Sequence, residues 1–158
     1  MIPLDEIEIV DYRPEYADDF AAINIEWLEE YFYVEDYDRE VLEKAEKYIL
    51  RPGGYIQFAR YKKENIGTVA LIKRDEGAFE LSKMGIRKAY RGKGLGHVLM
   101  QAAIDCAQSK GIQHLWLDSN RKLLPAIHLY KKFGFREIPV DPNTPYERCN
   151  IRMEKWLT

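Results

Sequence analysis

The segment IRKAYRGKGLGHVLM, residues 86–100, joins a strand-like run to the start of a long apolar helix. Its four basic residues and three alternate glycines do not favour a helix, because glycine lowers helix propensity and like charges repel. Gly92, Gly94 and Gly96 let successive backbone N–H groups converge, and the free N–H groups of the first helical turn add positive potential. The segment therefore predicts a site for phosphate or pyrophosphate. A glycine-rich turn with a solvated basic face is the plainer alternative.

The surrounding charges and spacing narrow the kind of anion site. No acidic residue interrupts the five basic ones near the loop: Lys83, Arg87, Lys88, Arg91 and Lys93. No pair of glycines supplies the P-loop pattern G-x-x-x-x-G-K-[ST]. The dinucleotide pattern G-x-G-x-x-G also fails, because its last position falls on His97 or Leu99. The pattern that remains is Arg91-x-x-Gly94-x-Gly96.

Length and composition indicate one globular domain over residues 1–158. Hydrophobic residues make up 46% of the chain and charged residues 32%, which is typical of soluble proteins. No apolar run approaches the roughly 18 residues that cross a membrane, and the N-terminal residues do not resemble a signal peptide. Because the two cysteines, Cys106 and Cys149, lie in dissimilar contexts, we expect the cytoplasm, no disulfide framework and no metal site.

The net charge of −2 conceals a strong asymmetry along the chain. Residues 1–47 hold 16 acids and 4 bases, whereas residues 48–158 hold 10 acids and 20 bases. Such a separation suits a protein that binds an anionic ligand on one side and a cationic ligand on the other. Attraction between the two regions, or solvation of each, explains it equally well.

Hydrophobic periodicity and turn residues predict a mixed sheet with helices, an α/β (α+β) domain. The expected strands are residues 6–12, 55–61, 66–72, 78–86, 114–118, 135–138 and 147–156. The expected helices are residues 15–30, 38–49, 95–110 and 124–133, the second capped by Asp38.

Two motifs in this order resemble the GNAT superfamily of N-acetyltransferases. The pattern Arg91-x-x-Gly94-x-Gly96 is similar to motif A, [QR]-x-x-G-x-[GA], and NRKLLPAIHLYKKFGF (120–135) is similar to motif B, which ends A-[IL]-x-L-Y-x-x-x-G-F. The resemblance implies the GNAT fold, a mostly antiparallel mixed sheet of about seven strands flanked by four helices. It also implies that the sheet splays between strands four and five, with a bulge for which Gly85 is a plausible place.

The resemblance further implies acetyl-CoA as co-substrate. The glycine loop would hold its pyrophosphate, and the end of the fourth strand would bind the pantetheine arm and polarise the acetyl carbonyl. Asn120 resembles the polar residue that contacts pantetheine or helps close the slot. The implied cofactor-binding residues are Met84, Gly85, Ile86, Arg91, Gly92, Lys93, Gly94, Leu95, Gly96, His97 and Asn120.

Two residues match positions that are catalytic in the family, and no metal is expected in the site. Tyr130 matches the tyrosine of motif B that protonates the departing thiolate, and the alternative is an ordinary tyrosine of an amphipathic helix. Glu80 has the spacing of the base glutamate in one branch of the family, eleven residues before Arg91. Its alternative is a structural glutamate that pairs with Lys83 or another base, and water chains replace a single base in many members.

The acceptor amine is expected near the first two helices and their connector, at Tyr31, Phe32 and Glu35. Acidic and aromatic residues there suit a cationic small molecule or a basic peptide, although ordinary packing explains much of the pattern. The rival class is a non-catalytic acyl-CoA-binding sensor or interaction module. The acidic first third argues against nucleic acid as partner, and nothing suggests a membrane. Homodimers occur in the family, and the sequence shows no interface for one.

Overall fold

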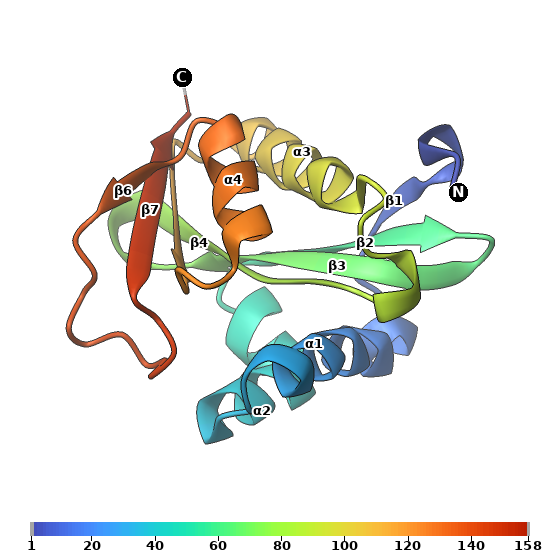
Figure 1. Ribbon diagram of the computed structural model, residues 1–158, viewed down its shortest axis with the longest axis horizontal. Coiled ribbons are helices and arrows are strands. Elements are labelled where there is room, and N and C mark those ends of the chain that lie inside the picture. The colour runs from blue at the N-terminus through green and yellow to red at the C-terminus, as the bar shows by residue number, and fades with distance from the viewer. Residues whose placement is uncertain (1, 158) are drawn as a thin grey trace.

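In the computed structural model, which describes residues 2–157 apart from the side chain of Glu76, one sheet lies between two layers of helices (Figure 1). Helices α1 (Ala17–Tyr31) and α2 (Asp36–Glu43) cover one face. Helices α3 (Leu95–Ser109) and α4 (Leu124–Lys132) cover the other. Short helical turns connect these elements at Leu4–Glu6, Pro14–Tyr16, Glu46–Leu50, Asp75–Gly77 and Lys88–Tyr90.

The sheet has seven strands in the order β1-β2-β3-β4-β5-β7-β6. All neighbouring strands pair antiparallel except β4 and β5, which pair in parallel. The predicted α/β fold class is therefore confirmed. The strands are β1 (Glu8–Asp11), β2 (Tyr55–Tyr61), β3 (Glu64–Lys73), β4 (Ala78–Ile86), β5 (His114–Ser119), β6 (Arg136–Ile138) and β7 (Ile151–Trp156).

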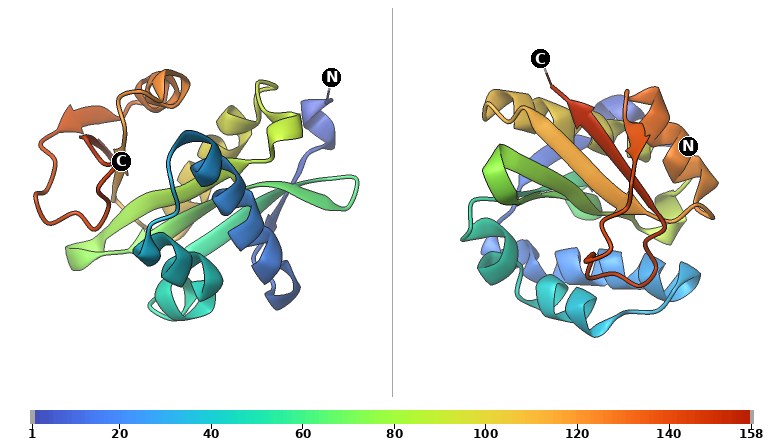
Figure 2. Two further views of the ribbon diagram at one scale, coloured as in Figure 1. Left: turned by 60° about the horizontal axis from the view of Figure 1, so that its bottom comes forward. Right: turned by 90° about the vertical axis from the view of Figure 1, so that its left-hand side faces the viewer.

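The parallel pair of β4 and β5 is short, and its end opens the sheet. Residues 78–80 of β4 pair with residues 114–116 of β5, after which β4 runs on alone on that side. The second half of β5 keeps only its antiparallel partner β7. Strands β5, β6 and β7 with α4 thus lean away from the rest of the sheet (Figure 2). This is the expected splay between strands four and five.

A β-bulge interrupts β4 just before the splayed end. Strand β3 pairs Ala70 with Ser82 and Thr68 with Gly85, so two residues of β4 face a single residue of β3. One of the two, Lys83, has a positive φ of 53°. The bulge was expected at Gly85, and it lies directly before that residue.

Two hydrophobic clusters, one on each face of the sheet, form the core. The first lies under α3 and α4, and the second under α1 and α2. Each covering helix contributes the apolar face that its sequence period predicts. The largest fully buried side chains are Phe20, Phe58, Ile23, Leu42, Ile49, Ile66, Leu71, Leu95, Leu99, Met100, Leu115 and Leu117.

Several predicted boundaries are wrong, including the end of α2, which stops at Glu43 and not at residue 49, and side-chain hydrogen bonds explain two of them. Helix α2 begins at Asp36 with Glu35 as its cap, because Glu35 and Asp38 form a reciprocal capping box. The last strand begins at Ile151 rather than at residue 147. The preceding residues are held away from the sheet, since Glu147 N–H donates to Glu35.

Candidate functional site

A cavity of about 480 Å³ opens where β4 and β5 diverge. Its walls come from α1, the whole second half of β4, the glycine loop, the start of α4 and three residues of the segment before β7. These segments are far apart in the sequence, and the splay of the sheet brings them together. The cavity is therefore the candidate site.

The three glycines of the loop are required for different reasons. Gly92 and Gly94 have φ of 74° and 86°, a region that favours glycine, and Gly94 caps α3. Gly96 lies inside α3, where a Cβ would stand 3.1 Å from Leu129 of α4. The first two shape a loop that lines the cavity, and the third lets the helices approach each other.

Arg91 connects this loop to both β4 and α1. Its Nε donates to the Ile86 carbonyl at 2.9 Å, and its guanidinium forms ion pairs with Glu30 and Glu26 of α1. The ion pairs fix the position of α1 against the anion loop.

The end of β4 presents an unpaired edge to the cavity. Arg87 N–H donates to the Ile66 carbonyl of β3, and antiparallel neighbours alternate in the direction of their hydrogen bonds. The N–H and carbonyl of Ile86 therefore point away from β3, into the gap. The Ile86 carbonyl already accepts a hydrogen bond from Arg91 Nε. The Ile86 N–H is therefore the group that can donate to a ligand.

Tyr130 of α4, the expected proton donor, lines the cavity. Burial raises its pKa to about 12. The hydroxyl therefore stays protonated at physiological pH and is available as a proton donor. Its ring also contacts Phe135, with ring centres 6.2 Å apart, so packing contributes to its position.

Glu80 of β4 also lines the cavity, and its side chain is nearly fully buried. Arg74 donates to Glu80 Oε1 from Nε at 3.0 Å and from Nη2 at 2.6 Å. The alternative pairing with a basic residue is thus present, with Arg74 and not Lys83 as the partner. Because both hydrogen bonds go to Oε1, Oε2 takes neither of them.

Most residues implied for acetyl-CoA do line the cavity, and three predicted site residues do not. Leu95 packs in the core and Lys93 is exposed. Glu35, expected at the acceptor, turns away to Arg148 and the N–H of Glu147. The predicted residues that line the cavity are Glu80, Met84, Gly85, Ile86, Arg91, Gly92, Gly94, Gly96, His97, Asn120, Tyr130, Tyr31 and Phe32.

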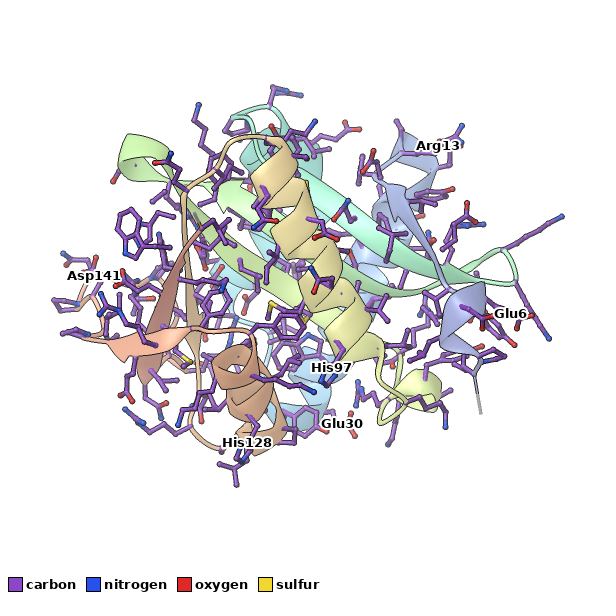
Figure 3. The ribbon with its side chains drawn as sticks, turned by 90° about the horizontal axis from the view of Figure 1, so that it is seen from above. Glu6, Arg13, Glu30, His97, His128 and Asp141 are labelled. Atoms are coloured by element: carbon purple, nitrogen blue, oxygen red, sulfur yellow. The ribbon has the colours of Figure 1, made fainter. Side chains whose placement is uncertain are left out.

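Asn120 and His97 both line the cavity and both have hydrogen-bond partners within the protein. Asn120 donates from Nδ2 to the Arg148 carbonyl at 2.7 Å and accepts from the N–H of Lys122, so it closes the wall rather than leaving a free amide. His97 at the start of α3 faces α4, where Lys132 Nζ donates to its Nε2 at 3.0 Å (Figure 3).

The structure contains a buried polar cluster around Lys83 that was not predicted from the sequence. The sequence had grouped Lys83 with the basic residues near the glycine loop. Lys83 Nζ donates to Tyr146 Oη at 2.6 Å and Asp38 Oδ1 at 3.4 Å. Arg148 makes two hydrogen bonds to Asp38, at 2.6 and 2.9 Å. The signal was too diffuse to find, because the four residues come from α2, β4 and the segment before β7.

Burial and neighbouring charges shift the pKa values of three groups in this cluster. Burial lowers the pKa of Lys83 to about 8, although Asp38 opposes the shift. Burial pushes the pKa of Asp38 upward, but the hydrogen bonds from Arg148 and the charge of Lys83 outweigh it and lower the pKa. Burial also raises the pKa of Tyr146 well above its usual value, so its hydroxyl stays neutral.

Within residues 2–157, no group of three or more histidine, cysteine, aspartate or glutamate side chains has the arrangement of a metal site. None of the helices in the same range is long and apolar enough to cross a membrane.

Comparison with known sequences places these motifs in a family. The model of the Acetyltransferase (GNAT) family matches residues 20–135. An uncharacterised N-acetyltransferase of Schizosaccharomyces pombe is 31% identical over 149 residues, covering 87% of this chain and 90% of that protein. Streptothricin acetyltransferase of Streptomyces lavendulae is 46% identical over 50 residues, which are 32% of this chain and only 26% of that protein.

Solved structures share the fold over nearly the whole chain. A GNAT-family acetyltransferase from Staphylococcus aureus has a TM-score of 0.85 at 24% identity, covering 96% of this chain and 99% of that one. The PaiA N-acetyltransferase of Thermoplasma acidophilum, solved in complex with coenzyme A, has a TM-score of 0.76 at 22% identity, with the same coverage.

Proposed function

The chain belongs to the GNAT acetyltransferase family, and on that premise we propose that it transfers an acetyl group from acetyl-CoA to a primary amine. The amine attacks the thioester directly within a ternary complex. The observation that carries the proposal is the single cavity in which the glycine loop, the free edge of β4 and Tyr130 meet. A relative of the same fold is known in complex with coenzyme A.

The described residues fit such a ligand. Gly92 and Gly94 adopt the positive φ that lets loop N–H groups converge, and the first turn of α3 adds its own N–H groups. Together they would hold the pyrophosphate. The Ile86 N–H, which points into the gap, would pair with the pantetheine arm or polarise the thioester carbonyl.

Two side chains would move protons. Glu80, oriented by Arg74, would accept the proton that the ammonium form of the substrate must lose. The protonated hydroxyl of Tyr130 would supply a proton to the sulfur of the departing thiolate. The two free cysteines suit a reducing compartment, so the proposal includes a cytoplasmic location.

A thiol-release assay with acetyl-CoA against a diverse panel of amines tests this function. We expect amine-dependent release of free CoA and an acetylated product with one added acetyl group. Binding of acetyl-CoA without release for any amine would contradict the proposal and favour the non-catalytic acyl-CoA sensor. A salt-dependent interaction with DNA or RNA in a control titration would instead indicate a nucleic-acid-binding protein.

A further inference from the structure

The acceptor end of the cavity, by which we mean its walls from α1, residues 80–83, Asp118, Tyr146 and Arg148, carries no surplus charge. Two described carboxylates line the cavity as a whole, Glu80 and Asp118. Arg74 pairs with the first at 2.6 Å, and Arg152 pairs with the second at 2.6 and 2.8 Å. Both carboxylate side chains are at least 96% buried.

The cations at the acceptor end are paired in the same way. Lys83 contacts Asp38, and Arg148 contacts both Asp38 and Glu35. Two cations therefore face two carboxylates. A charge that a ligand brought here would meet no uncompensated partner, and burying an unpaired charge costs several kcal/mol.

Among the described residues, no carboxylate of the first 47 positions lines the cavity. Glu26 and Glu30 of α1 pair with Arg91, and Glu40 of α2 pairs with Lys44 outside the cavity. The excess negative charge of this region is thus compensated by the basic loop or faces solvent. The expectation of an acidic acceptor lining does not hold for the described residues.

Aromatic side chains fill the space that the ion pairs leave. The indole of Trp27 lies 6.3 Å from the ring of Tyr31 and 6.1 Å from the ring of Phe32, and all three line the cavity. Tyr146 closes the far side and is only 5% exposed. A flat apolar group would gain from burial against these rings without displacing a charge.

Hydrogen bonds hold the connector between α1 and α2 in place. Tyr33 donates to Glu147, and Lys122 Nζ donates to the Tyr31 carbonyl at 2.7 Å. The connector is therefore tied to both neighbouring loops. A cavity of about 480 Å³, which must also hold the acetyl end of the co-substrate, suits a small molecule better than a segment of a folded protein.

We propose that the acceptor is a small primary amine whose remaining part is uncharged and aromatic or apolar. The inference rests on the proposed function, because Glu80 is then the one group that receives the proton of the reacting ammonium. A second ammonium, or a carboxylate next to the amine, would find the charged side chains of this end already paired. The Trp27 Nε1–H, which is buried without a hydrogen-bond partner among the described residues, is a neutral donor and does not compensate a charge.

Matched pairs of amines test this with the wild-type protein. Benzylamine and 1,4-bis(aminomethyl)benzene differ by a second ammonium, and 2-phenylethylamine and phenylalanine differ by a carboxylate. We expect kcat/KM to be at least about tenfold higher for the member of each pair that lacks the additional charged group. Equal use of both members, or a preference for the member with the additional charge or for spermidine, would overturn the inference.

A change in the cavity wall gives a second, opposite readout. Replacing Arg152 by Met leaves Asp118 without its ion pair, so the ratio of kcat/KM for the diamine to that for benzylamine should rise by about tenfold. Arg136→Met is the matched control, because Arg136 pairs with Glu154, which does not line the cavity. An unchanged ratio in Arg152→Met, with the fold verified by circular dichroism, would contradict the paired-charge argument.

The failure of the proposed function is distinguishable from the failure of this inference. If no amine causes thiol release, the acetyltransferase proposal is wrong. Calorimetric titration of the same four amines into the protein with CoA then still compares their affinities. Weaker binding of the two members with an additional charged group supports the inference, and equal or tighter binding overturns it.

Discussion

Removing the hydroxyl of Tyr130 distinguishes two roles for this residue. It is either a proton donor in the reaction or a tyrosine that only packs against its neighbours. In Tyr130→Phe the ring keeps its contact with Phe135, but the donor is lost. We expect kcat to fall about 100-fold while the affinity for acetyl-CoA stays nearly unchanged. Stopped-flow thiol release and CoA titration measure the two quantities. An unchanged kcat would remove Tyr130 from the mechanism.

The pKa of Tyr130 adds a condition on the pH profile. Because burial raises this pKa to about 12, the hydroxyl is still protonated at pH 10. Ionisation of Tyr130 should therefore not lower kcat between pH 7 and pH 10. The pH profiles of the wild type and of Tyr130→Phe should have the same shape in this range. A tyrosine-dependent fall in that range would mean that the cavity is more hydrated than the structure indicates.

Glu80 poses a similar choice between a base and a structural partner of Arg74. Glu80→Gln keeps the shape and a hydrogen-bond acceptor for Arg74 but cannot take a proton. We expect kcat/KM at pH 7 to fall by about 100-fold or more, and to recover toward the wild-type value at high pH, where the amine is already neutral. Full activity at neutral pH would end this assignment.

At the scale of elements, two substitutions in the β4 bulge test why Lys83 adopts a positive φ. A residue with a side chain pays about 1 kcal/mol or more in that region, whereas glycine adopts it freely. Lys83→Ala loses the contacts of Nζ and keeps the strain, and Lys83→Gly loses the contacts and relieves the strain. We therefore expect Lys83→Gly to unfold with a free energy about 1 kcal/mol higher than Lys83→Ala in urea titrations.

The activity of the same pair shows what the bulge does. If the side chain matters only because it anchors the bulge, Lys83→Gly should retain more kcat than Lys83→Ala, with equal KM for acetyl-CoA. Equal stability of the two variants would show that the backbone at residue 83 is not strained. Equal loss of kcat would show that the amine itself takes part.

The elements could be predicted from the sequence because their signals are local. Strands β2 and β4 have the predicted ends, and α3 stops one residue before the predicted one, since turns and glycines mark those limits. The partners of Glu80 and Glu35 could not be predicted, because Arg74 and Arg148 reach them only after the sheet has formed. Motif spacing located the cavity, and tertiary ion pairs decided its charge.

At the scale of the whole molecule, one buried group joins three regions. Asp38 of α2 binds Lys83 of β4 and Arg148 of the segment before β7. The same contacts close the cavity on the side of α1 and α2. The stability of the molecule and the shape of its site therefore depend on the same carboxylate.

Asp38→Asn should destabilise the protein by about 3–5 kcal/mol at pH 7, because Arg148 and Lys83 would remain buried without their counter-charge. Since the pKa of Asp38 is lowered in the folded state, its charge stabilises the fold above pH 4, and this contribution is lost as the pH falls through the folded value. Urea unfolding should therefore show a constant gap between wild type and variant from pH 7 to pH 4, and a smaller gap at pH 2. Glu40→Gln, which removes an exposed pair with Lys44, should unfold like the wild type throughout. A gap that is absent at pH 7, or that does not shrink in acid, would mean that Asp38 does not hold the three regions together.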